Sequence, residues 1–401
     1  MRKTIIASAI FFLLFTYGLV LSQNQLTVIP EELEPKNPVG FYDYKGISNV
    51  HTDRGLGSGS PLEVIKAAQE VGLDFLVFTD LNAFEKPALP HGYHRKLLVI
   101  GAEEFSYVDS RLLLYDLQKR HALESLGQTQ TLLADLLSQS GSEEKQDLIV
   151  LAHPLKPGFN WSGAYPAGLD GIEVINLKSV WRTAWDNQKA SFFWSAIVYP
   201  FNSALSLLRL YEEPERELAL WDQLSTTRHT IGMAGAEATA RSTPLGVGSI
   251  SFPSYQTSFS LLSNHVLLNS ELTGEAEGDR RKILNAIAEG NFYMSLDVLG
   301  EPKGFIATIQ DGEKTHLMGS RVKFQPGMKL IVKLPRRPRT PFEAAFLKDG
   351  QHLMSSNSVD SELELHGPGV YRVIVRVFTS FTLPDGNRWI TWLYSNPFYV
   401  E

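Results

Sequence analysis

The chain has 401 residues, of which 43% are hydrophobic and 20% are charged, and its formal net charge is −7. This composition excludes a disordered chain, and the length indicates two domains or one large domain with an appendage. The acidic charge argues against nonspecific binding to a nucleic-acid backbone. Because the sequence contains no cysteine, disulfide scaffolds, thiolate metal sites and cysteine nucleophiles are excluded.

The amino terminus has the pattern of an export signal. Arg2 and Lys3 precede an apolar run over residues 5–21, and polar residues follow from Ser22. We therefore expect residues 1–23 to be a signal peptide of a protein exported to the periplasm or the cell exterior. The run of ~17 residues is at the lower limit for a membrane-spanning helix, so an uncleaved membrane anchor is the alternative.

Helix and strand patterns alternate through the following part of the chain. Residues 60–63 form a capping box with proline at the first helical position, and Gly72 is a natural helix end. Apolar runs without polar alternation predict strands at 75–78, 97–100, 148–151, 172–175 and 230–233. Such runs belong to strands that are covered on both faces, so they predict a parallel sheet with helices outside it.

Each of these predicted strands ends in polar residues. The side chains concerned are Asp80, Glu103, His153, Asn176 and Glu237. In a closed β/α barrel the carboxyl ends of the strands meet at one face, and active sites are built there. The sequence therefore predicts an α/β barrel with a functional site at that face.

The pattern changes after residue 300. Alternating strands are predicted at 329–334, 343–348, 351–354, 362–365 and 370–377, with a hairpin turn at Asp349-Gly350. Short strands at this spacing are typical of an antiparallel sandwich. We therefore expect a β/α barrel over residues 24–300, a linker near 300–304 and a β-sandwich domain over 301–401.

Five segments at these strand ends resemble the motifs of the polymerase-and-histidinol-phosphatase (PHP) domain. They are Asn-Val-His-Thr at 49–52, Thr-Asp-Leu at 79–81, Gly-Ala-Glu at 101–103, Ala-His-Pro at 152–154 and Ala-Gly-Ala-Glu-Ala-Thr at 234–239. Three more segments resemble the exported, carbaryl-hydrolase-like branch of that family: residues 171–177, Trp221-Asp222 and residues 395–399.

The resemblance implies a distorted (β/α)7 barrel that binds two or three zinc, manganese or iron ions. Members hydrolyse phosphoesters or other ester-like bonds with a metal-bound water. Carried over by position, His51, Glu103, His153 and Glu237 keep the type of a metal ligand.

Other ligand positions of the family are changed in this chain. Asn49, Leu81 and Thr239 stand where the family has histidines, and Arg111 stands where a further histidine is expected. A cluster of several metals is therefore not expected. The four retained side chains predict at most one divalent ion, zinc, manganese or iron, and a cleft without metal is the alternative.

The candidate site residues have different expected roles. Glu103, Glu237 and Arg111 are the candidate catalytic groups, and Arg111 would pair with a carboxylate and replace the charge of a metal. Asn49 and Glu173 are expected around the ligands. Asp80 is expected to cap the following segment or orient a neighbour.

Three functions remain open from the sequence. The first is an exported, metal-dependent hydrolase of the PHP type with at most one ion. The second is an inactive PHP pseudoenzyme that acts as a binding or scaffolding module. The third is a metal-free acid/base enzyme that uses Glu103, Glu237 and Arg111. In each, we expect a small-molecule substrate or ligand in the barrel cleft, no nucleic acid, and membrane contact only through an uncleaved amino-terminal segment.

Two further segments have alternative interpretations. The aromatic stretch 192–201 predicts a helix packed over the barrel, with a pocket wall or a membrane contact as alternatives. The glycine-rich residues 55–60 predict a loop at the barrel rim, with anion binding at the following helix as the alternative.

Overall fold

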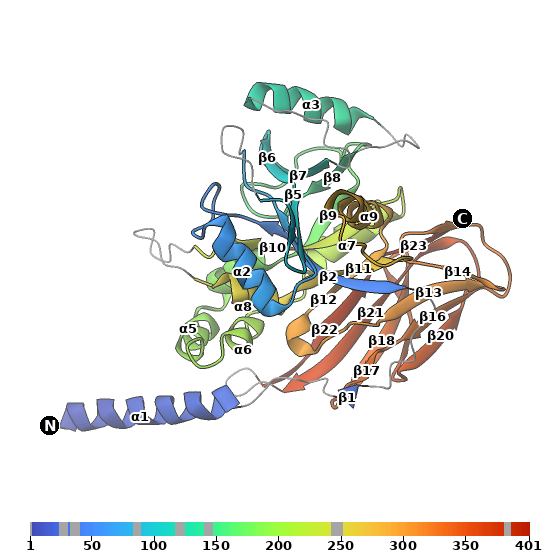
Figure 1. Cartoon of the computed structure of the whole chain (residues 1–401). Helices are drawn as coiled ribbons and strands as arrows, with labels where there is room; N and C mark the ends of the chain where they lie inside the picture. Colours follow the sequence, from blue (N-terminus) through green and yellow to red (C-terminus); the bar gives the residue numbers. More distant parts are fainter. Residues whose placement is uncertain are drawn as a thin grey trace.

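The computed structural model describes residues 2–23, 31–32, 41–82, 90–116, 125–139, 147–241, 252–380 and 386–401 (Figure 1). Its helices are α1 (Arg2–Gln23), α2 (Pro61–Val71), α3 (Leu126–Ser138), α4 (Leu177–Asn187), α5 (Lys189–Val198), α6 (Ser203–Leu208), α7 (Glu215–Ser225), α8 (Tyr255–Leu261) and α9 (Ala276–Glu289), with a 3-10 helix η1 (Asp297–Leu299). The chain forms a mixed α/β structure with a large central sheet and a second, smaller sheet.

The strands of the first 300 residues build the central sheet. They are β2 (Tyr42–Val50), β3 (Phe75–Phe78), β4 (Gly92–His94), β5 (Leu97–Gly101), β6 (Glu103–Tyr107), β7 (Ser110–Asp116), β8 (Asp147–Leu151), β9 (Gly171–Asn176), β10 (Ile231–Ala238), β11 (Ser263–Leu268) and β12 (Phe292–Ser295). Strands β10, β2, β3 and β5 are parallel neighbours in that order, and β8, β9 and β10 are parallel as well. The two groups share β10, and the hairpin β6–β7 continues the sheet beyond β8, because β7 pairs antiparallel with β8.

The predicted strands before residue 240 are present within a few residues of their expected bounds. Strand β10 is longer than the predicted strand 230–233, because its pairing with β2 continues to Ala238. All residues of β3, β8, β9 and β10 are buried, as expected for strands covered on both faces.

The predicted helix after residue 60 forms for the expected local reasons. The Ser60 hydroxyl accepts from the Glu63 amide, and the Glu63 carboxylate accepts from the Ser60 amide. Gly72 ends the helix with φ +77°, a conformation that favours glycine. Because Glu63 already satisfies this amino terminus, the structure gives no support to anion binding there.

The carboxyl-terminal strands belong to two sheets and pair antiparallel, except for the parallel pair β15–β23. Strands β13 (Ile306–Asp311), β14 (Lys314–His316), β16 (Lys329–Lys333) and β20 (Asp360–Glu364) make the smaller sheet. Strands β15 (Arg321–Val322), β18 (Phe342–Lys348), β19 (Gln351–Ser356), β21 (Gly369–Ser380), β22 (Asn387–Ser395) and β23 (Phe398–Val400) extend the central sheet. A separate ribbon pairs β1 (Glu31–Glu32) with β17 (Arg336–Arg337). The hairpin turn at Asp349-Gly350 is as predicted, with positive φ at both residues.

The two parts of the chain are joined by strand pairing. Residues 293–295 of β12 pair antiparallel with residues 393–395 of β22, so one sheet runs from the first part into the second. Figure 1 shows the carboxyl-terminal strands on one side of the molecule and helices α2, α5, α6 and α8 on the other. The linker expected near 300–304 therefore connects two parts of the chain that share one sheet, through the pairing of β12 with β22.

Helix α1 covers the residues predicted as a signal, and Figure 1 shows it extending from the body of the molecule. In the described part of the chain, no helix combines the length and the apolar character needed to cross a bilayer.

Candidate functional site

The strand ends bring most of the predicted site residues together. His51 follows β2, His153 follows β8 closely, Glu173 lies in β9 and Glu237 lies in β10. These strands are parallel and adjacent, with Val50 of β2 opposite Ala238 of β10. The side chains of His51, His153, Glu173 and Glu237 are almost completely buried. A cluster of imidazoles and carboxylates therefore lies at one end of the central sheet.

The carboxylate expected from the Gly-Ala-Glu segment is the neighbouring residue. Glu103 is exposed, whereas Glu104 is 2% exposed and lies between the two histidines. Its Oε2 is 3.2 Å from His51 Nε2, and its Oε1 is 3.9 Å from His153 Nε2. Successive side chains of a strand point to opposite faces, so a shift of one residue exchanges the inward and outward carboxylates. The position in the site that was predicted for Glu103 is thus occupied by Glu104.

Arg111 lies beside this carboxylate, as the charge-replacement hypothesis expects. Its Nε is 4.0 Å from Glu104 Oε1, in the ladder where β6 pairs with β7. The guanidinium also stacks over the ring of Phe159 at 5.0 Å, and Lys156 Nζ lies 5.4 Å from the same ring. His153 contacts Phe159 edge-on at 5.7 Å. Phe159 therefore packs against three of the basic side chains of the site.

Glu173 is the centre of a hydrogen-bond network. Its Oε1 accepts from Asn49 Nδ2 at 2.7 Å, and its Oε2 accepts from the His153 amide at 2.9 Å and from Asn176 Nδ2 at 3.0 Å. Burial raises the pKa of Glu173 to about 7, although these donors favour the ionised form. Gly235 is required beneath it, because a Cβ at that position would overlap the Glu173 carboxylate.

Glu237 is held by two lysines. Lys156 Nζ donates to both carboxylate oxygens, at 2.8 and 3.1 Å, and Lys178 Nζ lies 3.6 Å from Oε1. Burial alone would raise the pKa of Glu237, but the charges of Lys178 and Lys156 hold it at about 2. Burial lowers the pKa of His153, which favours a neutral imidazole. The charge next to Glu237 in this structure is therefore supplied by ammonium groups.

Asp80 supports the loop that follows His51. It accepts from the Thr52 amide at 2.7 Å and from the Thr52 hydroxyl at 2.6 Å. These contacts keep both carboxylate oxygens on the backbone turn after β2. Asp80 thus positions a neighbour of His51.

The backbone is unusual at the same place. Asn49, His153 and Glu237 have φ of +58°, +33° and +41°, in the left-handed region that disfavours most side chains. Such conformations cost on the order of 1–3 kcal/mol each and persist where the surrounding structure imposes them. Their coincidence with the charged cluster indicates that the strand ends are shaped for a site.

The described imidazoles and carboxylates of the site are not arranged as the ligand set that a divalent ion needs. Across the residues that the structure describes, no group of three or more His, Cys, Asp or Glu side chains is arranged to hold a metal. Glu237 has both oxygens on Lys156, and Arg111 lies beside Glu104. The arrangement therefore does not fit the metal centre that the resemblance implies. Three buried atoms nevertheless make no hydrogen bond: His153 Nδ1, and His51 Nε2 and Glu104 Oε2, which lie 3.2 Å apart without hydrogen-bond geometry.

A cavity of about 360 Å³ opens beside this cluster. His153, Lys156, Glu173 and Asn176 line it on the sheet side, and α4 and the start of α7 line the other side. Its volume suits a small molecule.

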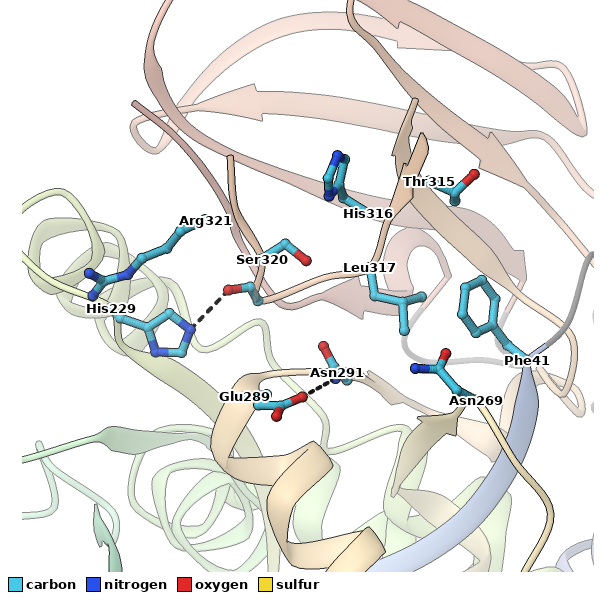
Figure 2. A pocket seen from close by; sticks show the side chains of 11 residues that line it. Phe41, His229, Asn269, Glu289, Asn291, Thr315, His316, Leu317, Ser320 and Arg321 are labelled. Carbon is cyan, nitrogen blue, oxygen red and sulfur yellow. Dashed lines mark hydrogen bonds between the residues drawn. The ribbon is translucent and has the colours of Figure 1, made fainter. Parts of the chain in front are cut away.

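A larger cavity of about 590 Å³ lies elsewhere, between the end of α9 and the carboxyl-terminal strands (Figure 2). His229 and Asn291 line it; they precede β10 and β12, so the cavity is at the amino end of β10, opposite Glu237. His229 bonds to the Gly319 carbonyl at 3.0 Å, and Asn291 donates to Glu289 at 2.7 Å. It is therefore separate from the site at the strand ends.

Comparison with known proteins found matches among solved structures, at low sequence identity. No protein-family model matches the chain, and no curated protein matches it. Among solved structures, a two-domain protein of Bacteroides vulgatus that contains a predicted PHP-like metal-dependent phosphoesterase is 11% identical; the match covers 90% of this chain and 97% of that one, with a TM-score of 0.32. A proposed metal-dependent phosphoesterase of Bifidobacterium adolescentis is 14% identical; the match covers 53% of this chain and 94% of that one, with a TM-score of 0.28. Both TM-scores are low, so these likenesses carry no argument about the site.

Sequence reasoning missed Glu104, Lys156 and Lys178. Each lies within three residues of a residue that it singled out: Glu103, His153 and Asn176. The two-residue alternation of a strand could have indicated Glu104, because it places residues 102 and 104 on the same face. Ala102 and Glu104 are both buried. Nothing in the local sequence distinguishes the two lysines from ordinary surface lysines, because their partner Glu237 is distant in the chain.

Proposed function

We propose that the site at the strand ends binds a small molecule through an anionic group, without a metal ion, in an exported PHP-like protein. The observation that carries this proposal is the pair of lysines on Glu237, which stands at the position of a family metal ligand. Ammonium groups here supply the positive charge that a metal would supply. This favours the binding-module alternative over a metal centre.

The geometry also supports the class of ligand. Lys178 is 40% exposed, and its Nζ lies 3.6 Å from Glu237 and 3.5 Å from Thr239 Oγ1, both long for a hydrogen bond. Its donors therefore remain accessible to a ligand beside Glu237, whereas Lys156 lines the cavity itself. A carboxylate or phosphate placed between Lys178 and Lys156 would gain charge-assisted hydrogen bonds in a partly desolvated place.

The proposal also includes a β/α barrel, a β-sandwich domain and an export signal. The order of the five motif segments and the parallel neighbours β10, β2, β3 and β5 support a PHP-like β/α barrel over residues 24–300. The antiparallel strands after residue 301 support a sandwich domain, and the basic and apolar start of the chain supports export by residues 1–23.

A hydrolase with one metal ion is the second candidate. It is favoured by the buried atoms of His51, Glu104 and His153 that lack hydrogen-bond partners, because buried polar atoms without partners are rare in folded proteins. Two imidazoles and one carboxylate are the ligand set of several catalytic zinc sites. An ion there would have to be bound without Glu237, or displace Lys156 from it.

The two candidates are separated by ligand and metal titrations of the full chain, followed by thermal unfolding. We expect inorganic phosphate to raise the unfolding temperature in the presence of a chelator, and Lys178→Met to abolish that increase. Lys189→Met, which changes an exposed lysine on α5, is the matched control and should keep it.

The opposite result would favour the hydrolase. Stoichiometric zinc or manganese in the purified protein, with stabilisation that is lost in His51→Ala and kept in Lys178→Met, would overturn the metal-free proposal. Absence of stabilisation by phosphate and by small carboxylates would remove the support for an anionic ligand.

A further inference from the structure

Helix α1 exposes apolar side chains over most of its described surface, while Leu14 and Tyr17 are half-buried. The exposed fractions of its exposed larger apolar residues range from 44% for Phe15 to 70% for Phe11, Phe12 and Leu13. Four consecutive residues from Ile10 to Leu13 are exposed, and consecutive residues of a helix point in different directions. A helix that is apolar all round is stable only when an apolar environment covers it.

In the described part of the chain, ring contacts join the carboxyl-terminal half of this helix to the body of the protein. The ring of Phe15 meets the ring of Phe201 edge-on at 6.0 Å, and Tyr17 lies 5.6 Å from Trp194 of α5. Figure 1 shows α1 on the same side of the molecule as α5 and α6. The apolar surface of α1 is therefore continuous with that of α5.

The outer side of α5 carries exposed apolar side chains as well, and α4 adds Trp185 among its exposed polar residues. Phe193 is 70% exposed and Trp185 is 40% exposed, and Trp185 packs edge-on against Phe192 at 4.9 Å. Ala190 and Ala196 are exposed on either side of Phe193. We call the surface formed by Trp185, Ala190, Phe193 and Ala196 the α5 face.

A lipid surface explains both features better than a protein groove. A groove would cover one side of α1 and leave the rest in water, whereas a bilayer interface accepts apolar side chains from α1 and from the α5 face together. Arg2 and Lys3 begin α1, Lys189 begins α5 and Arg182 is exposed on α4. These four cations outnumber the exposed Asp186 beside Trp185 and complement anionic headgroups. Tryptophan and phenylalanine at such a boundary are typical of membrane interfaces.

We propose that the α5 face docks on a membrane surface beside α1. The membrane contact then includes the folded body and is not confined to the amino-terminal segment. Because α4 also lines the cavity next to His153, docking would place the mouth of that cavity near the lipid.

The lack of cysteine allows a direct test, since one introduced cysteine can be labelled alone. Phe193→Cys in the full chain is labelled with an environment-sensitive fluorophore and mixed with vesicles of phosphatidylcholine and phosphatidylglycerol. Leu62→Cys and Val108→Cys are matched controls, because Leu62 and Val108 are 66% and 76% exposed but lie outside the α5 face.

We expect the Phe193 probe to gain intensity severalfold, to shift to the blue and to be quenched by spin-labelled lipid, while both control probes stay unchanged. If the protein floats with the vesicles while all three probes remain in water, then α1 alone binds the membrane. That result would overturn the proposal. Failure of the protein to float would overturn it too, as would a change of the Phe193 probe on self-association without lipid.

Discussion

At the site, two glutamates in similar burial, Glu173 and Glu237, differ in acid strength. Glu237 is paired with two lysines and has a pKa of about 2, whereas Glu173 receives only neutral donors and has a pKa of about 7. Glu104 lies between two imidazoles and a guanidinium. The number of nearby cations, rather than depth alone, therefore sets which carboxylate can exchange a proton near neutral pH.

Asn49→Asp tests the network around Glu173. Aspartate tolerates the positive φ of position 49, but it removes the donor to Glu173 and places a second carboxylate there. The folded pKa of Glu173 is raised above its ordinary 4.5, so its neutral form stabilises the fold fully below that value, and this contribution is lost as the pH rises through about 7.

The variant should therefore lose about 1–3 kcal/mol of unfolding free energy, and the loss should be larger near pH 8 than near pH 5. Urea unfolding at both pH values measures it. Asn49→Gly keeps the backbone conformation and adds no charge, so its loss should depend less on pH. An equal loss at both pH values for Asn49→Asp would contradict the assigned network.

Between elements, a second buried charge cluster joins β2, β11 and η1. His265 Nδ1 is 2.8 Å from Asp43, its Nε2 is 3.4 Å from Asp297, and Lys45 binds Asp297 at 2.6 Å. Burial alone would lower the pKa of His265, but Asp43 and Asp297 raise it to about 10. The Gly304 amide donates to Asp43 at 3.0 Å, so the cluster also fixes the start of the carboxyl-terminal part.

His265→Gln should destabilise the protein by about 3–5 kcal/mol, because it leaves two buried aspartates short of one positive charge. In the wild type, the charged imidazole stabilises the fold fully below its ordinary pKa of 6.5, and this contribution is lost as the pH rises through about 10. Denaturant unfolding measures the free energy of unfolding across this pH range. This free energy should decline with rising pH in the wild type and should decline less in the variant. His352→Gln, at an exposed histidine, is the control and should keep the wild-type decline.

At the scale of the whole molecule, several motif residues join the two parts of the chain. Asn396 bonds to Gly232 of β10 through its side chain, and Tyr399 Oη accepts from the Thr230 amide at 2.8 Å. Arg372 binds Asp222 with two hydrogen bonds, at 2.6 and 2.7 Å, and stacks over Trp221. The Trp-Asp segment and the terminal segment therefore make structural contacts between the first 300 residues and the following strands.

Asp222→Asn should weaken this junction by about 3–5 kcal/mol, because Arg372 is buried and would lose its charged partner. Calorimetry should show one unfolding transition in the wild type, since β12 and β22 share a sheet. The variant should unfold at lower temperature or in two steps. Asp186→Asn on exposed α4 should change little, and an equal effect of both substitutions would argue against the junction.

Local sequence patterns were sufficient to predict several helices, strands and turns and part of the site. The Ser60–Glu63 capping box, the Asp349-Gly350 turn and the apolar strands depend on neighbours within a few residues, so their pattern predicts them. His51 and His153 follow strand ends for the same reason. Tertiary packing selected Glu104 over Glu103, placed Lys156 and Lys178 on Glu237, and paired β12 with β22. These contacts join residues that are far apart in the chain or depend on which face of a strand is covered, and no local pattern records either.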